Sequence, residues 1–176
     1  MRKLIFFVFL ILSASFISAQ VYDPVTWDFS YEKTGDKQYE LIFNASIEEH
    51  WHIYSMDIPD GGPIPTTFTF DALPAFKLAG KTYEVTEPLD LLDEAFGFRI
   101  KTFSTKAEFR QKISAVESSF TVKGAVNFMA CNNATCSPPK DAEFEIVIKD
   151  QAANLKITSM NTGEAESSGP VSDRSL

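Results

Sequence analysis

The chain is poor in the residues that build most metal and nucleophilic sites. It has two histidines and two cysteines among 176 residues. A structural zinc site needs four ligands at short spacing, and a cysteine nucleophile needs a histidine base beside it. The sequence places neither arrangement, and it also lacks a glycine-rich phosphate loop, an internal repeat and an amphipathic helix. These absences argue against a zinc protein, a hydrolase and a nucleotide-binding enzyme.

Positive charge is scarce as well. Sixteen lysines and arginines stand against 24 aspartates and glutamates, for a formal net charge of −8. An acidic surface repels phosphate backbones and anionic headgroups. We therefore expect neither nucleic acid nor an anionic membrane surface as a partner.

Long apolar runs are absent except at the N-terminus. The basic start Met1-Arg2-Lys3 precedes a wholly apolar run over residues 4–12, and small residues follow up to Ala19. This order is typical of a secretory signal peptide, whereas a membrane anchor needs about 20 apolar residues. We predict a signal peptide over residues 1–19, and its cleavage removes two basic residues and changes the net charge from −8 to −10. Export allows a disulfide to form and persist.

Apolar residues alternate with other residues through most of the remaining chain. The clearest alternation covers residues 27–31, 39–47, 118–130 and 144–148. A period of two is the pattern of half-buried strands, and turn residues separate the runs. We predict about eight or nine short strands in an all-β, immunoglobulin-like β-sandwich over residues 20–150. Residues 151–176 are small, polar and acidic, which predicts a flexible linker or tail.

The two cysteines lie four residues apart in Cys131-Asn-Asn-Ala-Thr-Cys136, at the expected tip of a β-hairpin. They can bridge if the backbone brings their Cα atoms within about 7 Å. Asn132 and Asn133 favour such a turn because asparagine tolerates left-handed φ. A loop this small constrains the unfolded chain little, and a bridge that stabilises little is a candidate for redox chemistry. Spacing alone leaves a structural disulfide, a redox-active disulfide and a soft copper(I) site with Met129 open.

The two histidines belong to another segment. His50 and His52 are two residues apart, so on one strand they would share a face while Trp51 points away. Polar residues at a strand edge are the simpler interpretation, and nothing in the sequence places either histidine beside the cysteines.

Three separated stretches carry a family resemblance. They are residues 51–54 with 61–65 (Trp-His-Ile-Tyr and Gly-Gly-Pro-Ile-Pro), residues 93–97 (Asp-Glu-Ala-Phe-Gly), and residues 129–131 with 136–139 (Met-Ala-Cys and Cys-Ser-Pro-Pro). Together they resemble the N-terminal periplasmic domain of the DsbD family of thiol:disulfide interchange proteins. The resemblance covers roughly Asp23 to Lys149, which is essentially the whole expected folded part.

The resemblance implies a periplasmic thiol–disulfide oxidoreductase of the protein-disulfide reductase type, without cofactor or metal. Electrons would arrive from a membrane-embedded domain through a thioredoxin-like domain. They would leave to periplasmic disulfide isomerases or cytochrome c maturation proteins. The chain would be either stand-alone or the start of a longer protein tethered to the inner membrane. The alternative function is a non-catalytic exported β-sandwich binding module with a structural disulfide.

The resemblance also implies roles for individual residues. Cys136 would form the mixed disulfide with a partner, and Cys131 would resolve it. A cap loop would shield the pair until a partner docks, and its residues would be Asp93, Glu94, Ala95 and Phe96. Three further residues would lie near the pair: His52, Tyr54 and Thr135. The chain departs from the family pattern in a cysteine spacing one residue shorter, with Thr135 and Ala95 at positions where the family has aromatics.

Overall fold

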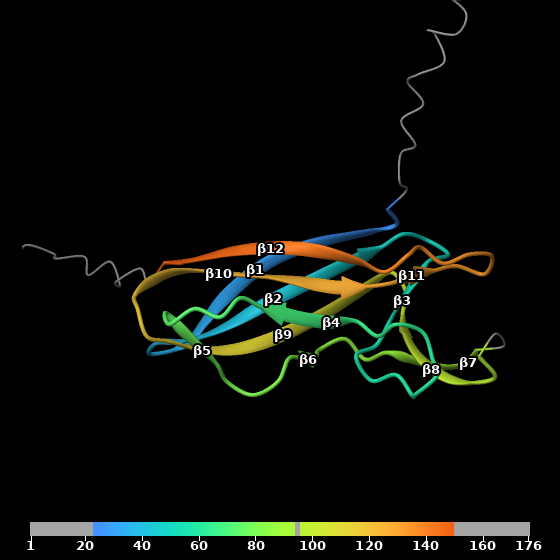
Figure 1. Cartoon of the computed structure of the whole chain (residues 1–176), viewed down its shortest axis with the longest axis horizontal. Helices are drawn as coiled ribbons and strands as arrows, with labels where there is room; N and C mark the ends of the chain where they lie inside the picture. The colour runs from blue at the N-terminus through green and yellow to red at the C-terminus, as the bar shows by residue number, and fades with distance from the viewer. Residues whose placement is uncertain (1–22, 94–95, 150–176) are drawn as a thin grey trace, which may run out of the picture.

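The computed structural model describes residues 23–93 and 96–149 (Figure 1). The predicted signal peptide, the predicted tail and the cap residues Glu94 and Ala95 lie outside the described residues, and those predictions stay open. Within the described ranges, no helix is long and apolar enough to cross a membrane.

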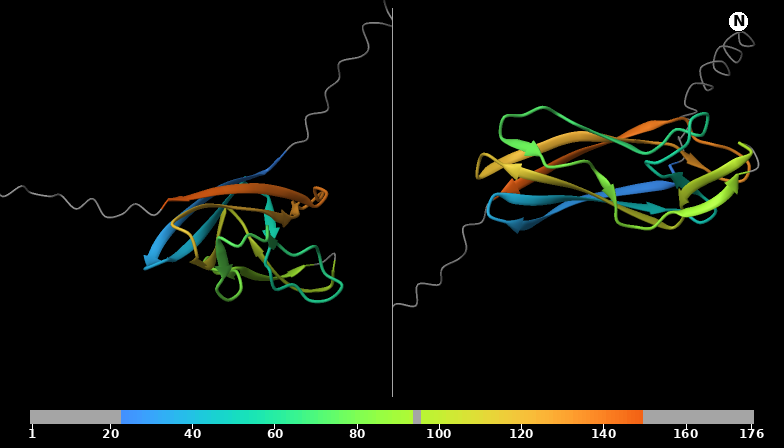
Figure 2. Two further views of the ribbon diagram at one scale, coloured as in Figure 1. Left: turned by 60° about the vertical axis from the view of Figure 1, so that its left-hand side comes forward. Right: turned by 90° about the horizontal axis from the view of Figure 1, so that it is seen from below.

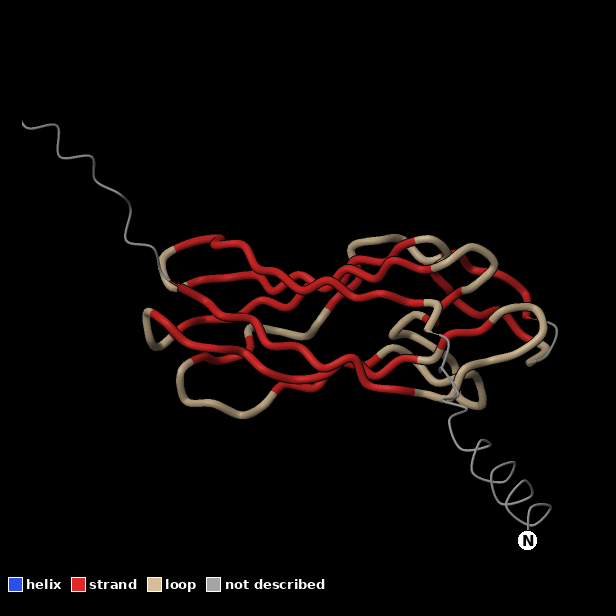
Figure 3. The backbone as a smooth tube through the Cα atoms, turned by 90° about the horizontal axis from the view of Figure 1, so that it is seen from above, coloured by secondary structure: helices blue, strands red, loops and turns tan. Residues whose placement is uncertain are grey.

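The described residues form twelve strands, and the tube in Figure 3 passes through strands and loops alone. The strands are β1 (Val25–Gly35), β2 (Gln38–Ile47), β3 (His52–Tyr54), β4 (Thr67–Phe70), β5 (Phe76–Leu78), β6 (Tyr83–Glu84), β7 (Leu89–Asp93), β8 (Phe98–Phe103), β9 (Lys106–Ala115), β10 (Ser119–Phe128), β11 (Ala130–Cys131) and β12 (Lys140–Lys149). The predicted all-β class is confirmed. The strand number exceeds eight or nine because several strands are only two to five residues long, too short to show clear alternation.

The strands of the described residues form three sheets. The first has the order β1-β2-β9-β5, with β6 also paired to β9, and the second has the order β12-β10-β4. The third, β11-β3-β8-β7, lies at one end of the other two, on the right of Figure 1 and at the same end in Figure 2. Hydrogen-bond pairing is antiparallel in every sheet.

The main core lies between the first two sheets and is rich in aromatic residues. On β2 the alternating residues predicted for one face are all buried: Tyr39, Leu41, Phe43, Ala45 and Ile47. The Phe43 ring lies 5.1 Å from Phe144 of β12 and 4.9 Å from Phe68 of β4, centroid to centroid. Such aromatic pairs add about 0.5–1.5 kcal/mol beyond the area that they bury. This core holds the two sheets together as a sandwich.

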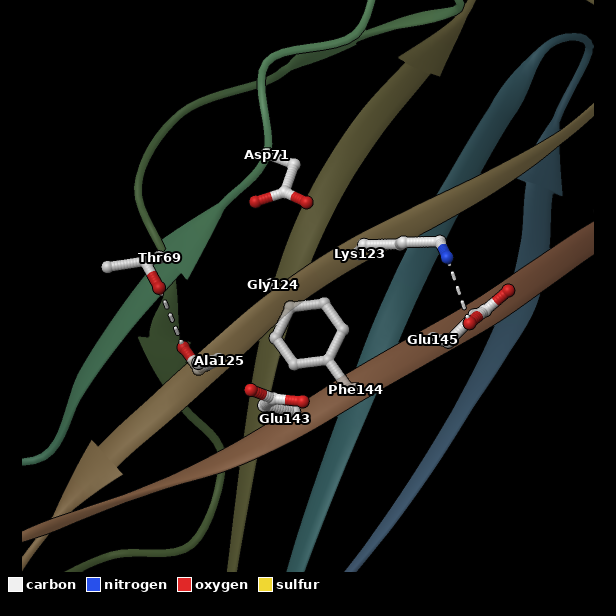
Figure 4. A pocket seen from close by; sticks show the side chains of 8 residues that line it. All are labelled: Thr69, Asp71, Lys123, Gly124, Ala125, Glu143, Phe144 and Glu145. Carbon is white, nitrogen blue, oxygen red and sulfur yellow. Dashed lines mark hydrogen bonds and ion pairs between the residues drawn. The ribbon is translucent and has the colours of Figure 1, made fainter.

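Gly124 allows β10 to fit between its neighbours. It pairs with Phe70 on β4 and with Phe144 on β12. Figure 4 shows the Phe144 ring beside Gly124. A Cβ atom at this position would lie 2.0 Å from the Thr69 carbonyl oxygen and 2.6 Å from Cζ of Phe144. The absence of a side chain therefore lets β4 approach and the Phe144 ring cover the strand.

Replacing Gly124 with alanine should lower the free energy of unfolding by about 2 kcal/mol, because backbone and ring must move to admit the methyl group. Urea unfolding followed by tryptophan fluorescence measures the change. The matched control is Lys123→Ala on the same strand as Gly124, which removes an exposed side chain and its 3.0 Å ion pair with Glu145 of β12. The control should change stability by less than about 0.5 kcal/mol. Equal effects of the two substitutions would contradict this account.

Candidate functional site

Cys131 and Cys136 face each other across an isolated antiparallel bridge at the end of β11, and they form a disulfide. The flanking backbone bonds run from the Asn132 amide to the Thr135 carbonyl (2.9 Å) and from the Ser137 amide to the Ala130 carbonyl (2.8 Å). The two cysteines are therefore a non-hydrogen-bonded pair of an antiparallel ladder. In such pairs the facing Cα atoms are closer than in hydrogen-bonded pairs. Their Cα atoms are 4.0 Å apart. The backbone itself brings the two side chains together.

The turn between the cysteines is held by a side chain. Asn132 Oδ1 accepts hydrogen bonds from the backbone amides of Ala134 and Thr135, both at 2.9 Å. Neither Asn132 nor Asn133 has positive φ. The prediction that asparagine serves here through left-handed φ is therefore wrong, since Asn132 stabilises the turn by accepting bonds from its neighbours instead.

The two cysteines differ in exposure. Cys131 is only 2% exposed and packs with Tyr54 and Ile100 in a small cluster separate from the main core. Three partly buried residues extend this cluster: Ile58, Phe98 and Met129. Cys136 is exposed. A reagent from solvent therefore meets Cys136 first.

An open cleft surrounds the pair. Its lining residues are His52, Tyr54, Leu92, Asp93, Phe96, Cys131, Asn132, Asn133 and Cys136. The structure thus brings together six of the residues predicted for the site, from β3, the β7–β8 turn and the cysteine loop. Thr135 lies in the same loop and is exposed, but it contributes its backbone to the turn and does not line the cleft. Leu92, Asn132 and Asn133 also line the cleft, although the sequence did not predict them as site residues.

A strand precedes the cap in a segment where the sequence shows no alternation of apolar residues. Residues 89–93 form β7, which pairs antiparallel with β8 along its whole length. The alternation is missing because the leucines on this edge strand stay exposed: Leu89 at 52%, Leu91 at 55% and Leu92 at 63%. Both faces of β7 therefore show apolar side chains, and the period of two that marks a half-buried strand cannot appear.

Asp93 closes the β7–β8 turn. Its carbonyl accepts a hydrogen bond from the Gly97 amide (2.8 Å), and its Oδ1 accepts one from the Phe96 amide (3.3 Å). Gly97 has φ +76°, a left-handed conformation that glycine adopts without steric cost. The Phe96 ring lies 6.2 Å from that of Phe98, which reaches the small cluster below. Among the cap residues that the structure describes, Phe96 is therefore the aromatic residue that lines the cleft.

His52 and Tyr54 form the wall of the cleft on β3. His52 Nε2 and the Tyr54 hydroxyl are 3.2 Å apart. Burial lowers the pKa of His52, and the charge of Asp93 opposes this shift in part. Burial first, and then the charge of Asp93, raise the pKa of Tyr54 to about 12. Both side chains are thus held neutral at pH 7, and the carboxylate of Asp93 acts on both.

His50 does not join this wall. It lies in the turn before β3 with φ +68°, and its side chain is 84% exposed at 3.6 Å from Glu49. The prediction that His50 and His52 share a strand face is wrong, because the strand begins only at His52. Among residues 23–93 and 96–149, no group of three or more histidine, cysteine or acidic side chains could hold a metal ion.

Several solved structures resemble this chain. The reduced N-terminal domain of DsbD from Neisseria meningitidis is 19% identical over 67% of this chain and 82% of that one, with a TM-score of 0.46. The N-terminal periplasmic domain of ScsB from Proteus mirabilis is 9% identical over 77% of this chain and 50% of that one, with a TM-score of 0.50. A chain from the complex between the DsbD and PilB N-terminal domains of Neisseria meningitidis is 14% identical over 72% and 87%, with a TM-score of 0.46. A search of curated proteins found no match.

A family model gives the decisive comparison. The model for the thiol:disulfide interchange protein DsbD, N-terminal, matches residues 19–148. The match includes both cysteines, the β7–β8 turn and the β3 wall of the cleft. The chain therefore belongs to the family of DsbD N-terminal domains.

Proposed function

We propose that this chain is an exported thiol–disulfide exchange module that passes electrons through Cys131 and Cys136 to thioredoxin-fold partner proteins. The observation that carries the proposal is the unequal exposure of a bonded pair inside one cleft, with Cys131 2% exposed and Cys136 open to solvent. Disulfide exchange needs one sulfur that a partner can reach and a second that closes the cycle. Membership of a family of thiol:disulfide interchange proteins supports the same conclusion.

The pair is first reduced by a partner dithiol. A partner thiolate attacks Sγ of Cys136, the disulfide between Cys136 and Cys131 breaks, and Cys131 leaves as a thiolate that takes up a proton. The second thiol of the partner then attacks the partner sulfur of the mixed disulfide and releases Cys136. Two electrons and two protons have moved from the partner dithiol, which becomes a disulfide, to the cysteine pair.

The reduced pair then acts on an oxidised partner. The Cys136 thiolate attacks the partner disulfide and forms a mixed disulfide, and Cys131 attacks Cys136 Sγ to release the reduced partner. Burial disfavours a thiolate at Cys131, whereas Cys136 is exposed to solvent. The environment thus favours Cys136 as the attacking group and Cys131 as the resolving group.

The rim of the cleft suits a protein partner. The exposed leucines Leu89, Leu91 and Leu92 make the edge strand β7 apolar on both faces, and Leu92 and Phe96 also line the cleft. Contiguous exposed apolar surface marks interaction sites in soluble proteins. We infer that a partner covers this edge when its cysteine reaches Cys136, and that Phe96 limits the approach of other oxidants.

The compartment and partners follow from the same proposal. The predicted signal peptide and the relative described as a periplasmic domain favour the periplasm. Periplasmic disulfide isomerases and cytochrome c maturation proteins are the expected acceptors, and a thioredoxin-like domain is the expected donor. The exchange itself uses sulfur chemistry alone and requires no cofactor.

Replacing Cys131 with serine should trap partners, because the mixed disulfide at Cys136 loses its resolving thiol. Incubation with a periplasmic extract and non-reducing electrophoresis should give adducts that dithiothreitol removes. The matched control is Cys136→Ser, whose remaining thiol is buried, and it should give at least about tenfold less adduct. Equal trapping by both variants, or none by either, would refute the division of roles.

Replacing Leu91 and Leu92 with serine should slow reduction of the disulfide by reduced thioredoxin by at least tenfold, because the loss of even one apolar contact of about 1.5 kcal/mol corresponds to that factor. The rate with dithiothreitol, which needs no docking surface, should stay within about twofold of the unchanged chain. Val147→Ser provides the control, since Val147 is 48% exposed on β12 outside the cleft. Equal slowing with both reductants would count against a docking role.

Replacing Asp93 with asparagine should lower the pKa of His52 further and bring that of Tyr54 below about 12, because the charge that raises both is removed. Nuclear magnetic resonance titration of the histidine ring follows the first change. Asp90→Asn is the control, since it removes the same charge from β7 at a residue paired with Arg99 (2.9 Å). An identical shift in both variants would mean that Asp93 has no specific effect on the cleft.

A further inference from the structure

A buried polar network holds the chain where it leaves β3, directly after Tyr54. Ser55 and Thr66 are both 0% exposed. The Thr66 hydroxyl donates to the Tyr54 carbonyl (2.5 Å), and the Thr66 amide donates to the Ser55 carbonyl (3.3 Å). The Ser55 amide donates to the carbonyl of Lys101 on β8 (3.0 Å). The end of β3 and the residue after it are thus held by hydrogen bonds to Thr66 and to Lys101 of β8.

Glu84 completes this network from another sheet. Its Oε1 accepts hydrogen bonds from the Ser55 hydroxyl (2.8 Å) and from the Met56 amide (2.7 Å). The Ser55 hydroxyl in turn accepts a bond from the Asp57 amide (3.0 Å). Hydrogen bonds to a carboxylate are about twice as strong as those between neutral groups. A single carboxylate oxygen therefore fixes the two residues that follow Tyr54.

Glu84 is itself anchored on a rigid support. It pairs with Phe109 of β9, a residue that is 0% exposed in the main core. The amide of Val85 donates to the Glu108 carbonyl (2.9 Å), and the Glu108 amide donates to the Thr86 hydroxyl (2.9 Å). The segment that carries Glu84 is therefore fastened to a long central strand. The same segment leads directly into β7, which forms the opposite wall of the cleft.

β3 needs such support because it is short. It has three residues, of which two pair with β11 and two with β8. Tyr54 is its last residue, is 2% exposed and packs against Cys131. A terminal residue of so short a strand has few bonds of its own to hold it in place. The hydrogen bonds of Glu84 to Ser55 and Met56 therefore help to fix the position of Tyr54.

We propose that Glu84 is a positioning residue of the cysteine site. It holds Tyr54 against Cys131, and through the Tyr54 hydroxyl it also holds His52. Glu84 touches neither cysteine and does not line the cleft. It acts through Ser55 and Met56 on the strand that carries the wall. The expected effect on disulfide exchange rests on the proposed function. The expected effect on the pKa of Tyr54 does not depend on that function.

The test compares Glu84→Ala with Glu84→Gln, which keeps one acceptor oxygen, and with Ser55→Ala, which removes one of the two donors. Glu87→Gln is the matched control, because it removes the same charge from an exposed residue of the same segment. Two quantities are measured in the whole chain: the equilibrium constant for exchange with dithiothreitol, and the pKa of Tyr54 from resonances assigned with Tyr54→Phe.

Glu84→Ala should change the exchange equilibrium constant by about fivefold, the effect of weakening one charge-assisted hydrogen bond. It should also move the Tyr54 pKa from about 12 towards its ordinary value of 10, since the phenol gains solvent. Glu84→Gln and Ser55→Ala should show smaller changes in the same direction, and Glu87→Gln none. If Glu84→Ala does not fold, Glu84→Gln and Ser55→Ala decide the question.

Variants at Glu84 and Ser55 that lower stability but leave both quantities unchanged would overturn the inference and make Glu84 a structural residue only. An unchanged chain whose disulfide resists both thioredoxin and dithiothreitol would refute the proposed function instead. In that case the Tyr54 pKa still decides whether Glu84 positions the wall. The two failures are thus distinguished by separate measurements.

Discussion

The cysteine site depends on the placement of one short strand, β3. Side chains alternate along a strand, so adjacent residues point to opposite faces. Ile53, which is 0% exposed, belongs to the main core, whereas Tyr54 belongs to the small cluster with Cys131. β3 also pairs with β11, which ends at Cys131, and with β8, which carries the cap hairpin. Three residues therefore connect the sandwich core, the cysteine pair and the cap.

This arrangement separates stability from chemistry. The aromatic core between the two large sheets stabilises the sandwich, and the disulfide closes a loop of few residues that contributes little to it. The cysteines, the cap and the β3 wall form a second group at one end of the molecule (Figure 1). Reduction of the bond can then change this group without unpacking the core. Such independence suits the proposed exchange role of the pair.

The sequence predicts those parts of the molecule in which one face of a strand is buried. Alternation on β2 and β10 is clear because the core removes one face from water, and the cysteine hairpin follows from the same pattern. β7 could not be predicted, since its exposed leucines lie on both faces and leave no apolar period. The start of β3 after His50 and the use of the Asn132 side chain depend on local backbone conformation. The role of Glu84 depends on contacts with Ser55 and Met56 that only the fold creates.

The central claim is that the disulfide between Cys131 and Cys136 is redox-active. The reduction potential of this pair tests the claim most directly. Equilibration of the chain with glutathione or thioredoxin buffers, with the free thiols counted after trapping, measures that potential. The account predicts a value between about −120 and −270 mV, the range of thiol–disulfide oxidoreductases. A value below about −300 mV, typical of structural disulfides that resist reduction, would contradict it.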